Sequence, residues 1–199
     1  MANFISIFRI FVAFFAIYLL FINTTWAYIL AFLFTVIAFI LDGVDGWVAR
    51  KFNESSQLGS VLDIMGDRIV EASYWIIYAT LGWLSPIFPI ICVTRAFTTD
   101  SLRSVALAQG YTAFGESSMQ SSKIGKFICA SRFMRISYAV AKVVAFILII
   151  VAHTPGFEML PMFSCMNAVA VVFAWIAIIF CVVRGIPVVV ESKKLFEKK

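Results

Sequence analysis

Six long apolar runs dominate this sequence, and they restrict the available folds more than any other feature. They cover approximately residues 4–22, 26–48, 58–83, 86–107, 130–152 and 162–184. A helix that crosses a bilayer needs about 20 mostly apolar residues, so each run is long enough to span one. Hydrophobic residues make up 62% of the chain, whereas soluble domains contain roughly 45–50%. We therefore predict an all-α integral membrane protein in which residues 1–199 form one domain, a single bundle of six transmembrane helices.

The distribution of lysine and arginine predicts how this bundle is oriented. With the N-terminus inside, the connections after the first, third and fifth runs face outward, and they contain no Lys or Arg. All 16 basic residues then lie on or towards the inner side, in agreement with the positive-inside rule. We expect a multi-pass protein of the cell inner membrane with both termini in the cytoplasm. The net charge of +5 follows from this topology and from attraction to anionic lipids, and it does not indicate a nucleic-acid partner.

The stretch LDGVDGWVARKFNESSQLGSVLDIMGDR, residues 41–68, places four aspartates at the expected cytosolic ends of the second and third helices. Asp42 and Asp45 are three residues apart, so they share one face of a helix. Asp63 and Asp67 are four apart and also share a face. If the two helices pack antiparallel, the carboxylates converge, and their repulsion disfavours the ionised forms unless cations bind. Oxygen ligands without His or Cys suit Mg²⁺ or Mn²⁺.

A pair of divalent ions at this position would suit phosphoryl transfer, because two metals can clamp the attacking and the leaving oxygen. Glycines in the stretch leave room for a ligand, and Arg50 offers a partner for phosphate. The alternative is that the aspartates are ordinary charges on solvated helix ends. Glu71 continues the Asp63 and Asp67 face by one turn. The sequence leaves open whether Glu71 pairs with a basic residue such as Arg68 or points into the same site.

The pattern D-x2-D-G-x2-A-R-x8-G-x3-D-x3-D is present in this stretch without a departure, at Asp42, Asp45, Gly46, Ala49, Arg50, Gly59, Asp63 and Asp67. The stretch resembles the signature of the CDP-alcohol phosphotransferase family, whose six-helix membrane architecture agrees with the apolar runs. The resemblance implies an active site on the cytosolic membrane face that transfers a phosphatidyl group from CDP-diacylglycerol to an acceptor alcohol. A hydroxyl of the acceptor attacks the β-phosphorus, and CMP leaves.

The resemblance also implies a role for each position of the pattern. Four carboxylates ligate the metal ions, those of Asp42, Asp45, Asp63 and Asp67. Asp67 is in addition the catalytic general base on the acceptor hydroxyl. The CDP subsite is formed by Gly46, Ala49, Arg50, Gly59 and Asp63. The implied cofactor is a pair of Mg²⁺ or Mn²⁺ ions, and the implied assembly is a homodimer surrounded by membrane lipids.

Three further segments resemble the phosphatidylglycerophosphate synthases of this family: NFISIFR at residues 3–9, TRAFTTDSLRSVALAQG at 94–110 and KIGK at 123–126. They imply glycerol 3-phosphate as the acceptor. The chain departs from that pattern in three places, one of which is residues 125–131, where GKFICAS replaces the continuation GK-x-K-T. Arg68 follows Asp67 where those synthases have lysine, and Ala96 stands where they have glutamate. The Asp-Arg pair is more like phosphatidylinositol phosphate synthases, so inositol phosphate is the alternative acceptor.

Basic residues in the later runs independently indicate a phosphorylated acceptor. Arg132, Arg135 and Lys142 lie at helical spacings of three and seven, so they share one face. Charged side chains within a span normally face the bundle interior or a watery cavity. We expect a cationic pocket for the acceptor phosphate formed by Arg95, Arg103, Lys123, Lys126, Arg132 and Arg135. The alternative for each residue is that its charged end reaches the inner headgroup layer.

Three other classes of protein compete with a lipid-synthesising transferase. An ion-coupled membrane transporter also uses intramembrane carboxylates, but it needs them at mid-span rather than at the cytosolic ends. An intramembrane prenyltransferase has two separate Asp-rich motifs and more helices than these runs supply. A catalytically inactive scaffold of the same fold does not need the intact pattern. Release of CMP that depends on a CDP-lipid separates the transferase from all three.

Overall fold

The computed structural model describes residues 2–51, 57–110, 122–156, 161–193 and 196, and these residues include helices but no strand. The helices are α1 (Ala2–Leu20), α2 (Thr25–Lys51), α3 (Gln57–Thr80), α4 (Ile87–Ala108), α5 (Lys123–Ala130), α6 (Arg132–Ala152) and α7 (Pro161–Glu191). Each of the six apolar runs lies in a helix, so the all-α prediction is confirmed.

The short helix α5 is an element that the apolar runs did not predict. Ser122 begins it by accepting a hydrogen bond from the Gly125 N–H at 2.9 Å. Ser131 separates it from α6, because its extended backbone ends α5 and its side chain accepts from the Met134 N–H at 3.2 Å. Serine suits such positions because its hydroxyl oxygen satisfies an N–H that has no partner within the first turn. The polar break expected before the fifth run therefore ends in a separate helix.

Among the described residues, four segments are long and apolar enough to cross a membrane: Asn3–Leu20, Thr25–Val44, Ile124–Ala152 and Cys165–Glu191. This composition is that of a membrane protein. The helices α3 and α4 are 24 and 22 residues long but are less apolar. The charged residues that lower their hydropathy are Asp63, Asp67, Arg68, Glu71, Arg95, Asp100 and Arg103. The charges that lower the hydropathy of α3 and α4 thus include four residues that the sequence assigned to the site, namely Asp63, Asp67, Arg95 and Arg103.

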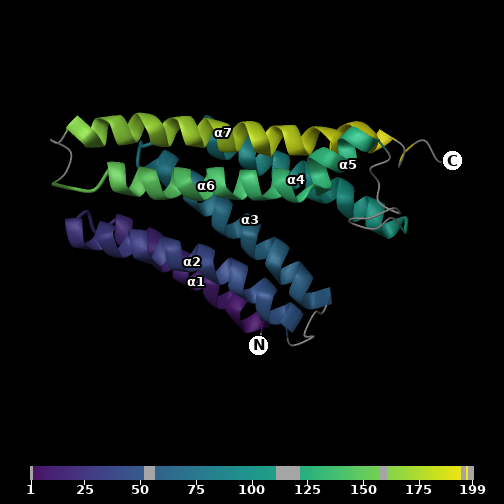
Figure 1. The fold of residues 1–199 in the computed structure, drawn as a ribbon, viewed down its shortest axis with the longest axis horizontal. Helices are drawn as coiled ribbons and strands as arrows, with labels where there is room; N and C mark the ends of the chain where they lie inside the picture. The colour runs from purple at the N-terminus through teal and green to yellow at the C-terminus, as the bar shows by residue number, and fades with distance from the viewer. Residues whose placement is uncertain (1, 52–56, 111–121, 157–160, 194–195, 197–199) are drawn as a thin grey trace.

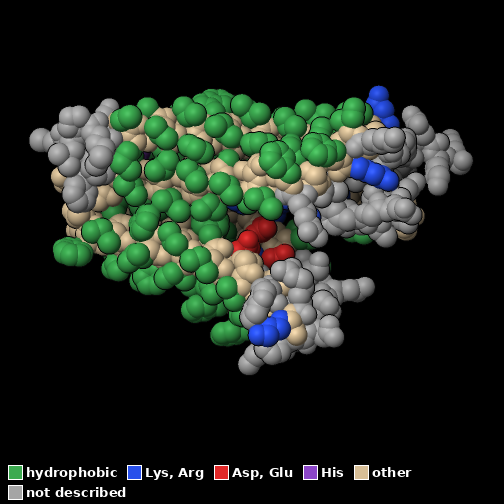
Figure 2. Space-filling view, in the orientation of Figure 1, with side chains coloured by type: hydrophobic (Ala, Val, Ile, Leu, Met, Phe, Trp, Pro, Cys, Tyr) green, Lys and Arg blue, Asp and Glu red, His purple; other side chains and the backbone are tan. Residues whose placement is uncertain are grey.

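The helices pack as two groups. In the first, α1 packs against α2 and α3, and in the second, α7 packs against α4, α5 and α6. Contacts of α3 with α4 and of α2 with α6 join the groups. Figure 1 shows that the N-terminal end of α1 and the C-terminal end of α2 lean away from α4, α6 and α7. In the space-filling view, acidic side chains lie in a recess between the two groups (Figure 2).

Aromatic side chains of α3 join it to α6 directly beyond the charged part of α3. The ring of Phe146 stacks on Tyr74 with centroids 5.0 Å apart and meets Trp75 edge-on at 4.7 Å. The Tyr78 hydroxyl donates to the Phe146 carbonyl at 2.9 Å. The hydroxyls of Tyr74 and Thr35 are 2.7 Å apart, which connects α3 to α2 as well. All five side chains are buried, so this cluster fixes α3 between its neighbours and holds its charged turns in place.

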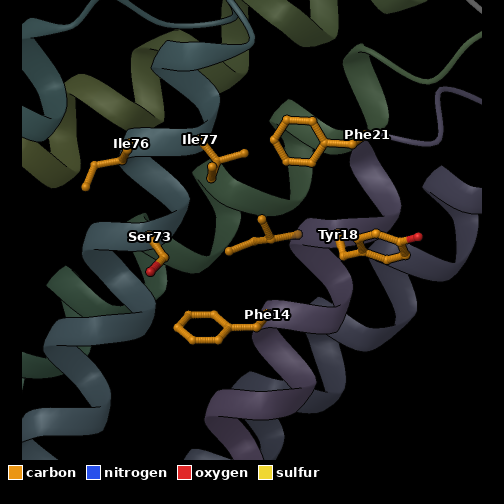
Figure 3. A pocket seen from close by; sticks show the side chains of 7 residues that line it. Phe14, Tyr18, Phe21, Ser73, Ile76 and Ile77 are labelled. Carbon is orange, nitrogen blue, oxygen red and sulfur yellow. The ribbon is translucent and has the colours of Figure 1, made fainter.

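An apolar hollow of about 410 Å³ lies between α1 and α3. Figure 3 shows side chains from both helices around it, and its lining consists of Phe14, Ile17, Tyr18, Phe21, Ser73, Ile76 and Ile77. These positions follow the charged residues of α1 and α3 by one to three turns. The residues that line the hollow offer hydroxyl groups but no charged side chain.

Candidate active site

Three of the four predicted aspartates come together where α2 and α3 meet. Asp42 lies near the C-terminal end of α2, and Asp63 and Asp67 lie one turn apart on α3. Each offers a carboxylate oxygen, and these oxygens all lie within 4.8 Å of one another. The three side chains are 39%, 52% and 48% exposed, so ions and substrates can reach them from water. Asp45 follows Asp42 by three residues on α2, but its side chain lies outside the described residues.

Arg9 of α1 extends into the centre of this cluster. Its Nη1 contacts the carboxylate of Asp42 and donates to Oδ1 of Asp67 at 3.2 Å. Its Nη2 donates to the Asp63 backbone carbonyl at 3.2 Å and lies 3.6 Å from the Asp63 carboxylate. The arginine is only 2% exposed. A single positive charge therefore lies among three negative ones, where the pattern predicted divalent cations.

The carboxylates have the chemistry that hard divalent cations require. The ligands are all oxygens, they converge from two helices, and they are open to water on one side. Mg²⁺ and Mn²⁺ prefer such sets and commonly keep part of their hydration shell. The residues present thus fit the predicted metal centre. Gly66 leaves room for Arg9 beside the carboxylates, because a Cβ at this position would lie 2.7 Å from Nη2 of Arg9.

A second group of potential ligands, Glu71, Cys92 and Cys181, lies one turn deeper in the bundle. It is fully buried, and its carboxylate is already paired. Lys142 Nζ donates to Glu71 at 3.2 Å, and the Tyr138 hydroxyl and the Cys92 thiol contact the same carboxylate. The sequence left open whether Glu71 pairs with a basic residue or points into the aspartate site. These contacts show that it pairs with a basic residue, Lys142 of α6. We interpret the group as a buried ion pair with hydrogen-bond partners rather than a metal site.

Positive charge gathers on α4 and α7 and on the adjoining turn of α3. Arg68 Nε donates to Asp100 at 3.1 Å, and Arg103 lies 3.9 Å from the other oxygen of the same carboxylate. Arg95 packs over Gly185, where a Cβ would lie 3.0 Å from its Cγ. The guanidinium of Arg184 lies 5.5 Å from the centre of the Tyr138 ring.

The three arginines Arg95, Arg103 and Arg184 act electrostatically on one another, so their charges repel. Within the described part of the chain, the buried Nε atoms of Arg95 and Arg184 have no hydrogen-bond partner. Buried donors without partners are costly, and a cluster of like charges is as well. Both costs would be relieved by an anion with several oxygens, such as a phosphate.

The remaining predicted residues fall into two sets. Gly46 and Gly59 are half-buried on α2 and α3, while Lys126 is half-buried on α5 and Arg135 is exposed on α6. The side chains of the others lie outside the described residues, and these are Ala49, Arg50, Lys123 and Arg132. Arg135 and Lys142 lie two turns apart on α6, and Lys142 is paired with Glu71.

Three participants were not assigned to the site from the sequence: Arg9, Asp100 and Arg184. Arg9 and Arg184 are isolated charges in apolar parts of α1 and α7, whereas Asp100 lies among polar residues of α4. A charge in an apolar part of a helix needs a partner or a polar cavity, and this requirement was the available signal. Most partners could not be identified, because Arg9 is far along the chain from the aspartates and Asp100 is far from Arg68.

A sequence model of the CDP-alcohol phosphatidyltransferase family matches residues 1–183, and the chain belongs to this family of transferases. The match covers all seven helices apart from the end of α7. It therefore includes the carboxylate cluster and the basic residues of α3 and α4. Family membership favours a transferase over the transporter and prenyltransferase alternatives.

Individual relatives match shorter stretches. A CDP-diacylglycerol--glycerol-3-phosphate 3-phosphatidyltransferase from Rickettsia typhi is 31% identical over 101 residues, 51% of this chain and 57% of the relative. The protein of the same name from Escherichia coli K12 is 29% identical over 68 residues, 34% of this chain and 37% of the relative. CDP-diacylglycerol--inositol 3-phosphatidyltransferase 1 from Arabidopsis thaliana is 43% identical over 51 residues, 26% of this chain and 22% of the relative. The chain thus spans less than two thirds of the length of each of these relatives.

Proposed function

We propose that this protein synthesises a phospholipid by transferring a phosphatidyl group from CDP-diacylglycerol to glycerol 3-phosphate, giving phosphatidylglycerophosphate and CMP. The observation that carries the proposal is the convergence of Asp42, Asp63 and Asp67 within 4.8 Å at a water-accessible recess. Membership of the CDP-alcohol phosphatidyltransferase family supports the reaction type. The names of the Rickettsia and Escherichia relatives support the acceptor.

In this mechanism, Asp42, Asp45 and Asp63 hold the metal ions, with Asp67 completing the set. Bound Mg²⁺ or Mn²⁺, in two positions, supplies charge neutralisation of the diphosphate and of the leaving CMP. The hydroxyl oxygen of the acceptor bonds to the β-phosphorus, and Asp67 accepts the proton of that hydroxyl. The bond from that phosphorus to the bridging oxygen breaks, and CMP takes the electron pair. The CDP moiety lies along Gly46, Ala49, Arg50 and Gly59.

The acceptor phosphate is bound by arginines on α4 and α7. Arg95 and Arg103 belong to the pocket predicted from sequence, and Arg184 joins them because its charge acts on both. Lys123, Lys126, Arg132 and Arg135 complete the cationic surroundings. The buried Nε atoms of Arg95 and Arg184 supply N–H groups to phosphate oxygens. Such binding places the acceptor hydroxyl beside Asp67.

The proposal includes the placement of the protein in the membrane. All six long helices cross the inner membrane, both termini and the recess lie at its cytoplasmic face, and two copies form a homodimer. Ion pairs of these helices support this topology, since Arg68 of α3 pairs with Asp100 of α4, and Glu71 of α3 pairs with Lys142 of α6. Lysines and arginines on one side of all spans support the orientation.

Inositol phosphate is the second candidate acceptor. It is favoured by Arg68, which follows Asp67 where the glycerol 3-phosphate enzymes have lysine. Arg68 pairs with Asp100 of α4 at 3.1 Å, so its exchange for lysine would alter the wall of the arginine cluster. The name of the Arabidopsis relative also includes inositol.

The test is release of CMP from CDP-diacylglycerol by the purified protein in detergent with Mg²⁺ or Mn²⁺. Glycerol 3-phosphate, inositol phosphate, inositol and serine are offered separately. We expect release with glycerol 3-phosphate and a loss of about 10²-fold or more in Asp67→Asn, because this change removes the general base and one metal ligand. CMP release with inositol phosphate and with no other acceptor would support the proposed reaction type but identify inositol phosphate as the acceptor. No release with any acceptor by folded protein would refute the proposed function.

A further inference from the structure

Arg9 occupies the place that divalent cations need. Its two Nη atoms reach Asp42, Asp63 and Asp67, the same three carboxylates whose oxygens converge within 4.8 Å. A Mg²⁺ ion binds carboxylate oxygens at about 2.0–2.1 Å, whereas a guanidinium nitrogen approaches them at about 2.7–2.9 Å. The guanidinium and a metal ion would compete for the same carboxylate oxygens, because Arg9 already contacts all three carboxylates. Arginine and metal ions are therefore alternative partners of one cluster.

The arginine is built into this position rather than resting on the surface. It is 2% exposed, and Gly66 provides the room for it. Its Nε is buried and, among the described residues, has no hydrogen-bond partner. The helix α1 offers it no carboxylate of its own, since Ala2–Leu20 contains no acidic residue. The contacts that hold Arg9 thus come from α2 and α3.

We propose that Arg9 is a resident counter-ion, which holds the three carboxylates together in the metal-free protein and gives way when divalent cations bind. This inference rests on the proposed function, because it takes the cluster to be the metal site. Without Arg9, three neighbouring carboxylates repel and the junction of α1, α2 and α3 loses its cation. With Arg9, every cation that binds must first compete with the guanidinium.

The competition has a measurable consequence. If the metal-competent state is only a fraction of the metal-free protein, the apparent affinity for metal is reduced by that fraction. Removing the guanidinium should therefore strengthen metal binding while it weakens the metal-free fold. A role for Arg9 in merely orienting the carboxylates predicts the opposite sign for metal binding. The sign of the change is thus the decisive observation.

The experiment measures Mn²⁺ binding by electron paramagnetic resonance on the full chain in detergent. We expect Arg9→Gln to bind Mn²⁺ about tenfold more tightly than the original protein, as for an arginine that occupies the cluster about nine tenths of the time. Its unfolding temperature should be lower in EDTA, and Mg²⁺ should raise it by more than it raises that of the original protein. Arg9→Lys keeps the positive charge but not the planar guanidinium, so its affinity for Mn²⁺ should lie between those of the original protein and Arg9→Gln.

Two controls make the result specific. Lys193→Gln removes one positive charge from an exposed side chain after α7 and should leave Mn²⁺ affinity unchanged. Asp67→Asn removes a ligand and should weaken Mn²⁺ binding. Equal or weaker binding in Arg9→Gln and in Arg9→Lys, with both proteins folded by circular dichroism, would overturn the proposal for Arg9 and leave the proposed function intact. Absence of Asp67-dependent Mn²⁺ binding in the original protein would instead overturn the metal site itself.

Discussion

Glu71 of α3 and Lys142 of α6 form an ion pair, with Oε2 and Nζ 3.2 Å apart, one turn beyond Asp67. The two side chains are only 3% and 11% exposed. The hydroxyl of Tyr138 also contacts the Glu71 carboxylate. This pair joins the helix that carries two of the three clustered carboxylates to the second group of helices. The pair therefore helps to hold α3, with its two clustered carboxylates, against α6.

Lys142→Met should destabilise the protein strongly, because it leaves the carboxylate of Glu71 buried without its cation. Removing one partner of a buried ion pair costs about 3–5 kcal/mol of the free energy of unfolding. The double change Glu71→Gln with Lys142→Met should cost less than Lys142→Met alone, since no unpaired charge remains. Chemical unfolding in detergent provides the measurement. Equal stability of Lys142→Met and the exposed-site variant Lys193→Met would show that the pair does not form.

Gly66→Ala should destabilise the metal-free protein by about 1–3 kcal/mol, as overpacking of a close contact does. The added Cβ would lie 2.7 Å from Nη2 of Arg9, whose position is held by carboxylates on two helices. Gly43→Ala is the matched control, because no atom lies within 4 Å of a Cβ at that position on α2. The control should be neutral or stabilising by about 0.5–1 kcal/mol, since alanine favours helix. Chemical unfolding of both variants in EDTA measures these changes. An equal loss in the free energy of unfolding in both variants would contradict the close approach of Arg9 to Gly66.

Arg95→Gln and Arg184→Gln should each raise KM for glycerol 3-phosphate more than they lower kcat. A hydrogen bond to a charged group contributes about 1.5–3 kcal/mol, so kcat/KM should fall roughly 10- to 100-fold. KM for CDP-diacylglycerol should change little, because the residues proposed for the CDP subsite belong to α2 and α3. Steady-state kinetics with each substrate varied in turn gives the answer. A larger effect on KM for the donor would assign these arginines to the diphosphate instead.

Labelling of single cysteines should show that α4 crosses the membrane. Ser85 is exposed in the connection before α4, and Gln109 is exposed after it. In a Cys165→Ala background, Ser85→Cys should react with a membrane-impermeant maleimide only from the outer side, and Gln109→Cys only from the inner side. The other three cysteines are buried and should react slowly. Vesicles of either orientation allow labelling from each side of the membrane to be compared. Reaction of both cysteines from the same side would mean that α4 does not cross the membrane.

Much of the fold and of the carboxylate cluster could be predicted because it depends on local pattern. The apolar runs predicted the six long helices, and the spacing of Asp63 and Asp67 predicted that they share a face. The short helix α5 was missed because its signals are two serine caps around eight residues rather than a long apolar run. The role of Asp45 stays a prediction, as do those of Lys123 and Arg132, since their side chains lie outside the described residues.

The sequence by itself therefore determined the helices, their apolar surfaces and the short stretch that holds the aspartates. Only the tertiary structure decided which helix supplies each counter-charge: Arg9 of α1 for the aspartates, Lys142 of α6 for Glu71 and Asp100 of α4 for Arg68. The physical reason is that helical periodicity fixes the direction of a side chain around its own axis. The partner it meets depends on how helices distant in sequence pack and rotate against one another, and no local pattern encodes that.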